Sequence, residues 1–200
     1  MATNDRDIRS ALYQTELARF VADPHSLLVD ELGVCQGEFR IDVAVVNGAL
    51  HGWEIKSDRD TLARLPAQAE AYSRVFDEVT LVVGDTHLEQ AVSRIPGWWG
   101  VLAASRGRDR AVLAAVRAPT PNPAPDAVAL AQLLWRDELV AILAELGAPG
   151  KLLRRPRWDL WPALAERLDV GELGVRVRAA LKARPGWRRP HDPGPGSPPA

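Results

Sequence analysis

The stretch RIDVAVVNGALHGWEIK, residues 40–56, decides the fold because it reads as two β-strands joined by a short turn. The runs Ile41–Val46 and Leu50–Lys56 are rich in β-branched and apolar residues. An Asn-Gly pair between two such runs is a strong signal for a β-hairpin. The sequence therefore predicts two neighbouring antiparallel strands.

The length of the hairpin loop determines which side chains share a face of the sheet. A two-residue turn would place Asp42 opposite Trp53 and leave Glu54 on the other face. A three-residue loop, Asn47–Ala49, closed by a residue in the left-handed conformation, places Asp42 opposite Glu54. We favour the three-residue loop because it gathers the charged side chains on one face and the large apolar side chains on the other.

The three-residue loop also predicts a metal site. Asp42 and Glu54 would have Cβ atoms about 4.5–5.5 Å apart, close enough to share one cation. Mg²⁺, or Mn²⁺ in its place, is the expected ion because it takes oxygen ligands and is usually held by only one or two carboxylates. The backbone carbonyl of Ile55 could supply a third oxygen, and Lys56, on the same face as Glu54, could orient a metal-bound water.

The order Asp42, Glu54-x-Lys56 and then Gln68-xxx-Tyr72 resembles the PD-(D/E)XK nuclease superfamily, within a bacterial group of uncharacterised members. The resemblance covers about the first half of the chain, with isoleucine in place of the proline of the motif. It implies an α/β fold with a restriction-endonuclease-like α-β-β-β-α-β core and a mixed sheet. It also implies that Asp42 and Glu54 are metal ligands and that Lys56 is the catalytic lysine.

The resemblance implies further site residues. Members of the superfamily often add an acidic residue from the first helix or strand, and Glu31 is favoured here over Glu16. In RecB-like members, a pair such as Gln68 and Tyr72 lies beside the metal and positions the substrate. Arg64, just before that helix, could contact a phosphate or form an ion pair at the helix start.

Composition and charge are typical of a cytoplasmic protein that is not inserted in a membrane. The 200 residues include one cysteine, Cys35, and no run that is apolar enough for a membrane span or a signal peptide. Residues 1–118 hold 13 basic and 17 acidic residues, whereas residues 119–200 hold 12 and 9. The basic second part could attract the phosphates of nucleic acid.

Proline-rich sequence divides the chain into a nuclease-like domain, 1–118, a linker, 119–126, a basic helical domain, 127–184, and a disordered tail, 185–200. Three helices are expected in the third part: Ala127–Leu146, Pro156–Leu168 and Val170–Ala183. They could form a helix-turn-helix-like unit that docks nucleic acid or a helical cap on the first domain, and the sequence favours neither. A hydrophobic-core role is expected for the tryptophans at positions 98, 99, 135, 158 and 161.

These observations predict a Mg²⁺-dependent nuclease, a hydrolase of phosphodiester bonds, with DNA favoured over RNA as its substrate. The alternative is a catalytically inactive nuclease-fold protein that binds DNA or regulates through its basic helical region. The sequence leaves open endonuclease or exonuclease cleavage, the specificity of the protein, and whether it forms a homodimer.

Overall fold

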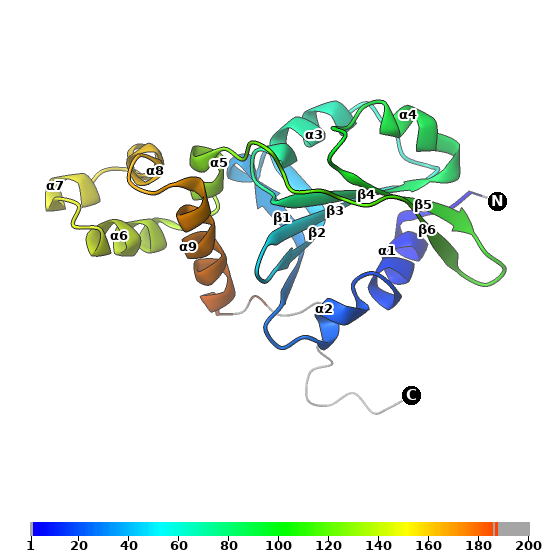
Figure 1. Ribbon diagram of the computed structural model, residues 1–200, viewed down its shortest axis with the longest axis horizontal. Coiled ribbons are helices and arrows are strands. Elements are labelled where there is room, and N and C mark those ends of the chain that lie inside the picture. Colours follow the sequence, from blue (N-terminus) through cyan, green and yellow to red (C-terminus); the bar gives the residue numbers. More distant parts are fainter. Residues whose placement is uncertain (1, 186, 188–200) are drawn as a thin grey trace.

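A six-stranded mixed sheet forms the centre of the described chain, which comprises residues 2–185 and 187 of a computed structural model (Figure 1). The strands lie in the sheet in chain order: β1 (Leu27–Val34), β2 (Phe39–Val46), β3 (Leu50–Lys56), β4 (Glu78–Gly84), β5 (Gly100–Arg106) and β6 (Ala111–Arg117). Strand β2 is antiparallel to both of its neighbours, β1 and β3, whereas β3, β4 and β5 are parallel, and β6 is antiparallel to β5. The prediction of an α/β fold with a mixed sheet is confirmed.

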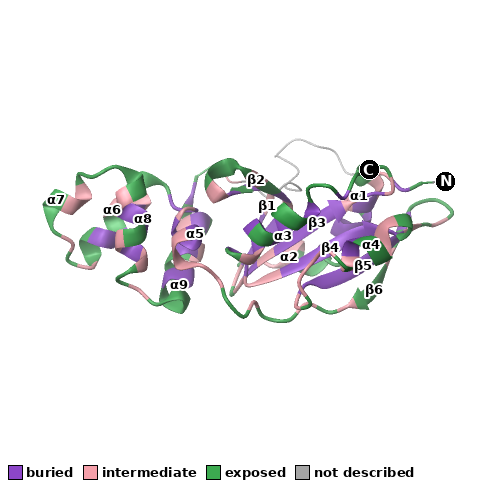
Figure 2. Ribbon diagram, turned by 90° about the horizontal axis from the view of Figure 1, so that it is seen from above, coloured by how far each residue is buried: buried purple, intermediate pink, exposed green. Residues whose placement is uncertain are grey.

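Helices cover both faces of this sheet (Figure 1). On one face lie α1 (Asp5–Gln14) and α2 (Ala18–Ala22), and on the other α3 (Leu65–Ser73) and α4 (Leu88–Val92). Because the central strand β4 is shielded on both faces, nearly all of its residues are buried, as its run EVTLVVG suggests. Figure 2 shows this concentration of buried residues in the sheet.

The β2–β3 hairpin has the register of the three-residue loop. Val46 lies opposite Leu50 and Val43 opposite Trp53, as that loop requires. The regular pairing ends at Val43, and Ile41 packs beside Gly52 on the face that carries Glu54, so the placement of Asp42 directly opposite Glu54 stays a prediction. The prediction of a left-handed residue at the end of the loop is wrong, since neither Gly48 nor Ala49 has a positive φ. The Asn47 side chain closes the loop instead, because its Oδ1 accepts a hydrogen bond from the Ala49 amide at 3.0 Å.

Two helical runs of the sequence are interrupted. The run from Ile8 to Phe20 divides at residues 15–17 into α1 and α2, and the predicted helix Ala127–Leu146 divides into α5 (Ala127–Ala131) and α6 (Arg136–Glu145). At the second break, side chains satisfy the free backbone groups: Glu138 accepts from the Trp135 amide at 2.7 Å, and Arg184 donates to the Leu133 carbonyl at 2.6 Å. The predicted stop at Gly147 is confirmed, and its φ of 75° is one that glycine adopts without strain.

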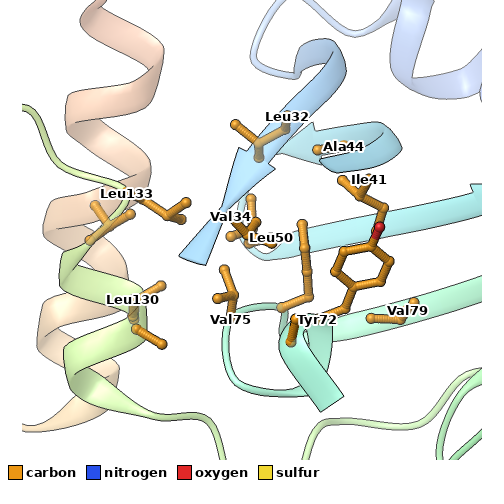
Figure 3. Packing of buried hydrophobic residues seen from close by; sticks show 14 of the residues in the cluster. Leu32, Val34, Ile41, Ala44, Leu50, Tyr72, Val75, Val79, Leu130 and Leu133 are labelled. Carbon is orange, nitrogen blue, oxygen red and sulfur yellow. The ribbon is translucent and has the colours of Figure 1, made fainter. Parts of the chain in front are cut away.

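The remaining helices are α7 (Gly150–Leu153), which the sequence did not predict, α8 (Arg157–Ala165) and α9 (Val170–Ala183). The helical region α5–α9 lies beyond the β1 and β2 end of the sheet (Figure 1). Figure 3 shows Leu130 and Leu133 facing Val34 and Val75, and all four belong to one cluster of buried apolar side chains. The two parts of the chain therefore share a hydrophobic core, and the division into domains stays a prediction.

The tryptophans only partly follow expectation. Trp99 and Trp161 are buried, as expected, and Trp98 is partly buried. The core role predicted for Trp135 and Trp158 is wrong, since they are 52% and 65% exposed. Most of the tail predicted as disordered, residues 186 and 188–200, lies outside the described residues. Among the described helices, none has the length and apolar character needed to cross a membrane.

Candidate functional site

Glu54 lies at the centre of a buried polar cluster on the inner strands of the sheet. Its Oε1 accepts a hydrogen bond from Lys56 Nζ, two residues further along β3, and another from Gln68 Nε2 on α3, at 2.6 Å. Gln68 Nε2 also donates to the Tyr72 hydroxyl at 3.2 Å, and this hydroxyl donates to the Arg40 carbonyl at 2.7 Å. The structure thus brings together two residues of β3, Glu54 and Lys56, with two residues of α3, Gln68 and Tyr72.

Asp42 is held by groups on two elements. Its Oδ2 accepts from the Ile55 amide at 2.7 Å, so Ile55 presents its N–H to Asp42. Its Oδ1 accepts from Arg9 Nη2 at 2.8 Å, and Arg9 Nη1 also donates to the Asp42 carbonyl at 3.0 Å. Sequence reasoning missed Arg9, because nothing in the local pattern of α1 indicates a partner 33 residues further along the chain.

The additional acidic residues do not join Glu54. Glu31 has a φ of 57° within β1 and forms ion pairs with Arg9 and Arg40, both at 3.3 Å, so it approaches the site only through Arg9. Glu16 is exposed between α1 and α2, and Arg64 is exposed at the start of α3. Within the described part of the chain, neither Glu16 nor Arg64 contacts the cluster by a hydrogen bond or an ion pair.

Burial controls the protonation of the two carboxylates. Loss of water raises the pKa of Glu54 to about 7, and the negative charge of Asp42 adds to this rise while Lys56 opposes it. Burial also raises the pKa of Asp42, against the Ile55 amide and Arg9, which favour its charged form. Two cations, Arg9 and Lys56, therefore lie beside the two carboxylates, so side chains of the protein itself largely neutralise the negative charge of the cluster.

Two oxygens of the cluster have no hydrogen-bond partner in the described structure: Glu54 Oε2 and Gln68 Oε1. Both are hard oxygen atoms of the kind that Mg²⁺ prefers. Among the described residues, however, no three His, Cys, Asp or Glu side chains are grouped to hold a metal. A cation here would depend on the Gln68 amide or on a backbone oxygen, and the ligand role of the Ile55 carbonyl stays a prediction.

A second feature lies at the far end of the helical region. The segment KLLRRPR, residues 151–157, contains four basic residues and no acidic residue, and all four basic side chains are exposed. Arg155 lies 3.4 Å from Asp159, whereas no ion pair is found for Lys151, Arg154 or Arg157 within the described chain. We call residues 151–157 the basic segment.

Comparison with known proteins places the chain in a family. The family model described as "Bacteriophage P4 protein cII" matches residues 2–188, almost the whole chain. The chain belongs to the bacteriophage P4 protein cII family. Protein cII of Enterobacteria phage P4 is 33% identical over 75 residues, which make up 38% of this chain and 28% of that protein. The matched stretch thus spans less than a third of the curated relative.

Membership of the P4 protein cII family corrects the sequence interpretation. The assignment to the PD-(D/E)XK nuclease superfamily is wrong, and so are the nuclease and hydrolase functions that were predicted from that assignment. The physical reason is that an aspartate opposite a Glu-x-Lys strand also suits a buried, self-compensated ion network, as Arg9 and Lys56 make here. No solved structure matches the chain, so the finer prediction of a restriction-endonuclease-like core stays a prediction.

Proposed function

We propose that this P4 protein cII family member is a regulatory protein that binds nucleic acid, with DNA as its first candidate, through its basic helical region. The observation that carries the proposal is the basic segment, where four exposed cations follow one another without an acidic residue. Exposed Lys and Arg side chains attract phosphates and displace counterions from the nucleic acid. Regulation by binding requires no bond to be broken.

The ion pairs elsewhere in the helical region support this location. Arg176 pairs with Glu145 at 2.6 Å, Arg178 with Asp77 at 3.2 Å and Arg184 with Glu138 at 2.7 Å. These arginines are therefore paired with acidic residues of the same chain. At α7 and the start of α8, three of the four exposed cations have no such partner within the described chain, so they can act on an external polyanion.

The test is binding of a fluorescent 20-base-pair duplex across a series of salt concentrations. The double variant Lys151→Gln/Arg154→Gln should bind more weakly, and the slope of log K against log salt should fall by about 2, one for each lost phosphate contact. The matched control is Arg106→Gln/Arg108→Gln. It removes two exposed cations from the β5–β6 hairpin, at the opposite end of the molecule (Figure 1).

We expect the control to bind like the unmodified protein. Equal losses in both double variants would show that the attraction is not localised to the basic segment. No duplex binding at low salt would remove the proposed function.

We propose separately that the cluster around Glu54 binds Mg²⁺ or Mn²⁺, without any hydrolytic role. The support is the pair of buried oxygens, Glu54 Oε2 and Gln68 Oε1, that have no partner in the described structure. Binding to the folded chain alone should raise the melting temperature as the ion concentration increases. Glu54→Gln should abolish that rise, and a rise of equal size in the variant would place the ion elsewhere.

A further inference from the structure

A pocket of about 430 Å³ lies between the helical region and the end of β1. Its walls come from β1, from the turn that follows β1, from the α5–α6 connection and from α8. This volume falls in the range of about 300–1,000 Å³ that is usual for small-ligand sites. The pocket is separate from the buried cluster around Glu54, since it shares no lining residue with that cluster.

The pocket wall contains a hydrogen-bond donor without a partner. Trp161 lines the pocket and is only 4% exposed, and its indole Nε1–H is buried with no acceptor in the described structure. A buried donor that lacks an acceptor is rare in proteins. Because Nε1 has almost no accessible surface, it marks an imperfectly packed pocket wall and is not a contact open to a ligand.

The rim of the pocket is aromatic and positively charged. Trp135 is 52% exposed, and the Arg184 guanidinium lies 4.2 Å from the centre of its ring. Arg184 is itself neutralised by Glu138, which holds it with two hydrogen bonds at 2.8 and 2.7 Å. The indole of Trp135 is therefore fixed in place by groups that carry no net charge.

Two further cations at the rim of the pocket have no acidic partner within the described chain. Among the described residues, Arg136 donates to the carbonyls of Leu153 and Arg155, at 3.1 and 3.3 Å, and Arg157 lies over the Trp161 ring at 5.4 Å. Within the described chain, no carboxylate pairs with either of them. The pocket thus joins a flat aromatic surface to positive charge, the combination that proteins use to hold the bases and phosphates of single strands.

The backbone beside the pocket is strained. Cys35 and Gln36 have φ values of 49° and 60°, although neither is glycine, and Gly37 follows with 88°. Gln36 and Gly37 both line the pocket. For residues other than glycine such conformations are strained, and they cluster at ligand sites.

We propose that this pocket binds an unpaired nucleotide of single-stranded DNA, with the base against Trp135 and the phosphate near Arg136 and Arg157. A paired base cannot enter, because its faces are stacked and its edges are occupied within the duplex. This inference rests on the proposed function and deepens it, since it names the form of nucleic acid that the protein selects.

The test compares a labelled 12-nucleotide oligothymidine with a duplex of the same length, by fluorescence anisotropy at one salt concentration. Trp135→Ala should weaken binding of the oligothymidine about tenfold, the effect of losing one stacked base, and leave duplex binding unchanged. Trp158→Ala is the matched control, because Trp158 is 65% exposed on α8 but does not line the pocket. It should change neither affinity.

Each outcome decides the proposal. An unchanged affinity of Trp135→Ala for oligothymidine, or an equal loss in Trp158→Ala, overturns the pocket site while duplex binding keeps the proposed function intact. Absence of binding to both forms of DNA overturns both. If Trp135→Ala does not fold, Arg136→Gln on the same rim, outside the basic segment, replaces it, with an expected loss of several-fold for oligothymidine and none for the duplex.

Discussion

Arg9 shows how one side chain can decide the character of a site. The Asp42 side chain is 19% exposed and the Arg9 side chain 23%, so their ion pair at 2.8 Å is largely removed from water. The desolvation of both charges is offset only while both are present. The cluster that resembled a metal site is in this respect a contact between α1 and the sheet.

Replacement of Arg9 by methionine should lower the free energy of unfolding by about 2 kcal/mol, because it leaves the Asp42 carboxylate buried without its partner. Urea unfolding measures the change. The same substitution at the exposed Arg6, also on α1, is the control and should have little effect. Equal losses at both positions would mean that the Arg9 ion pair contributes nothing specific.

His51 predicts a pH dependence of stability. Burial lowers its pKa to about 3, even though Nδ1 lies 3.3 Å from Glu78 and the ring stacks on Trp53 with centroids 3.8 Å apart. In the unfolded chain a histidine titrates near pH 6.5. Below that pH the unfolded chain binds a proton that the folded chain does not, so stability present above pH 6.5 is lost as the pH falls toward 3.

Between pH 7.5 and pH 5, the unmodified protein should therefore lose about 2 kcal/mol of stability more than His51→Gln. Denaturant unfolding at the two pH values gives this difference. His25→Gln, at an exposed histidine, should retain the pH dependence of the unmodified protein. A His51→Gln variant with an unchanged pH dependence would contradict the buried, neutral state of His51.

At the scale of the element, the β2–β3 hairpin is closely packed at Gly52, between Ile41 of β2 and Phe76 in the turn that follows α3. A Cβ atom at Gly52 would overlap Ile41 Cδ1 and lie 3.2 Å from Phe76 Cδ1, whereas a Cβ at Gly48, in the loop, would meet nothing within 4 Å. Both positions have φ values outside the left-handed region. The two glycines of one hairpin therefore differ only in the space around them.

Gly52→Ala should cost about 1–3 kcal/mol, the usual effect of overpacking, and Gly48→Ala should be close to neutral. Thermal unfolding of the two variants measures this contrast. Comparable melting temperatures would show that Phe76 and Ile41 can move aside without cost.

At the scale of the whole molecule, the helical region and the sheet share one hydrophobic core. Leu130, on α5, is 6% exposed and faces Val75 and Val34 (Figure 3). Arg178 on α9 adds an ion pair with Asp77, at 3.2 Å, across the same boundary. We expect the two parts to unfold together.

Leu130→Ala should lower the free energy of unfolding by about 2–4 kcal/mol and keep a single transition. Circular dichroism and tryptophan fluorescence should report the same midpoint. The control is Val175→Ala, at a side chain on α9 that is 58% exposed. Two separate transitions would show that the shared core does not couple the two parts.

Local patterns in the sequence determined the two strands of the hairpin, their register and the helix end at Gly147, because alternation, loop length and glycine act over a few residues. They also placed Glu54 and Lys56 on one face, where the two side chains form an ion pair. The same patterns suggested a nuclease family, and the family comparison showed that this interpretation is wrong.

Only the tertiary structure decided what surrounds those residues. Arg9 reaches Asp42 from a distant helix, Arg184 closes the break before α6, and Trp135 is left exposed beside a pocket. Each of these contacts joins residues at least 33 positions apart or depends on how helices pack on the sheet. No local pattern encodes such contacts, because their energy arises only when the separate elements come together.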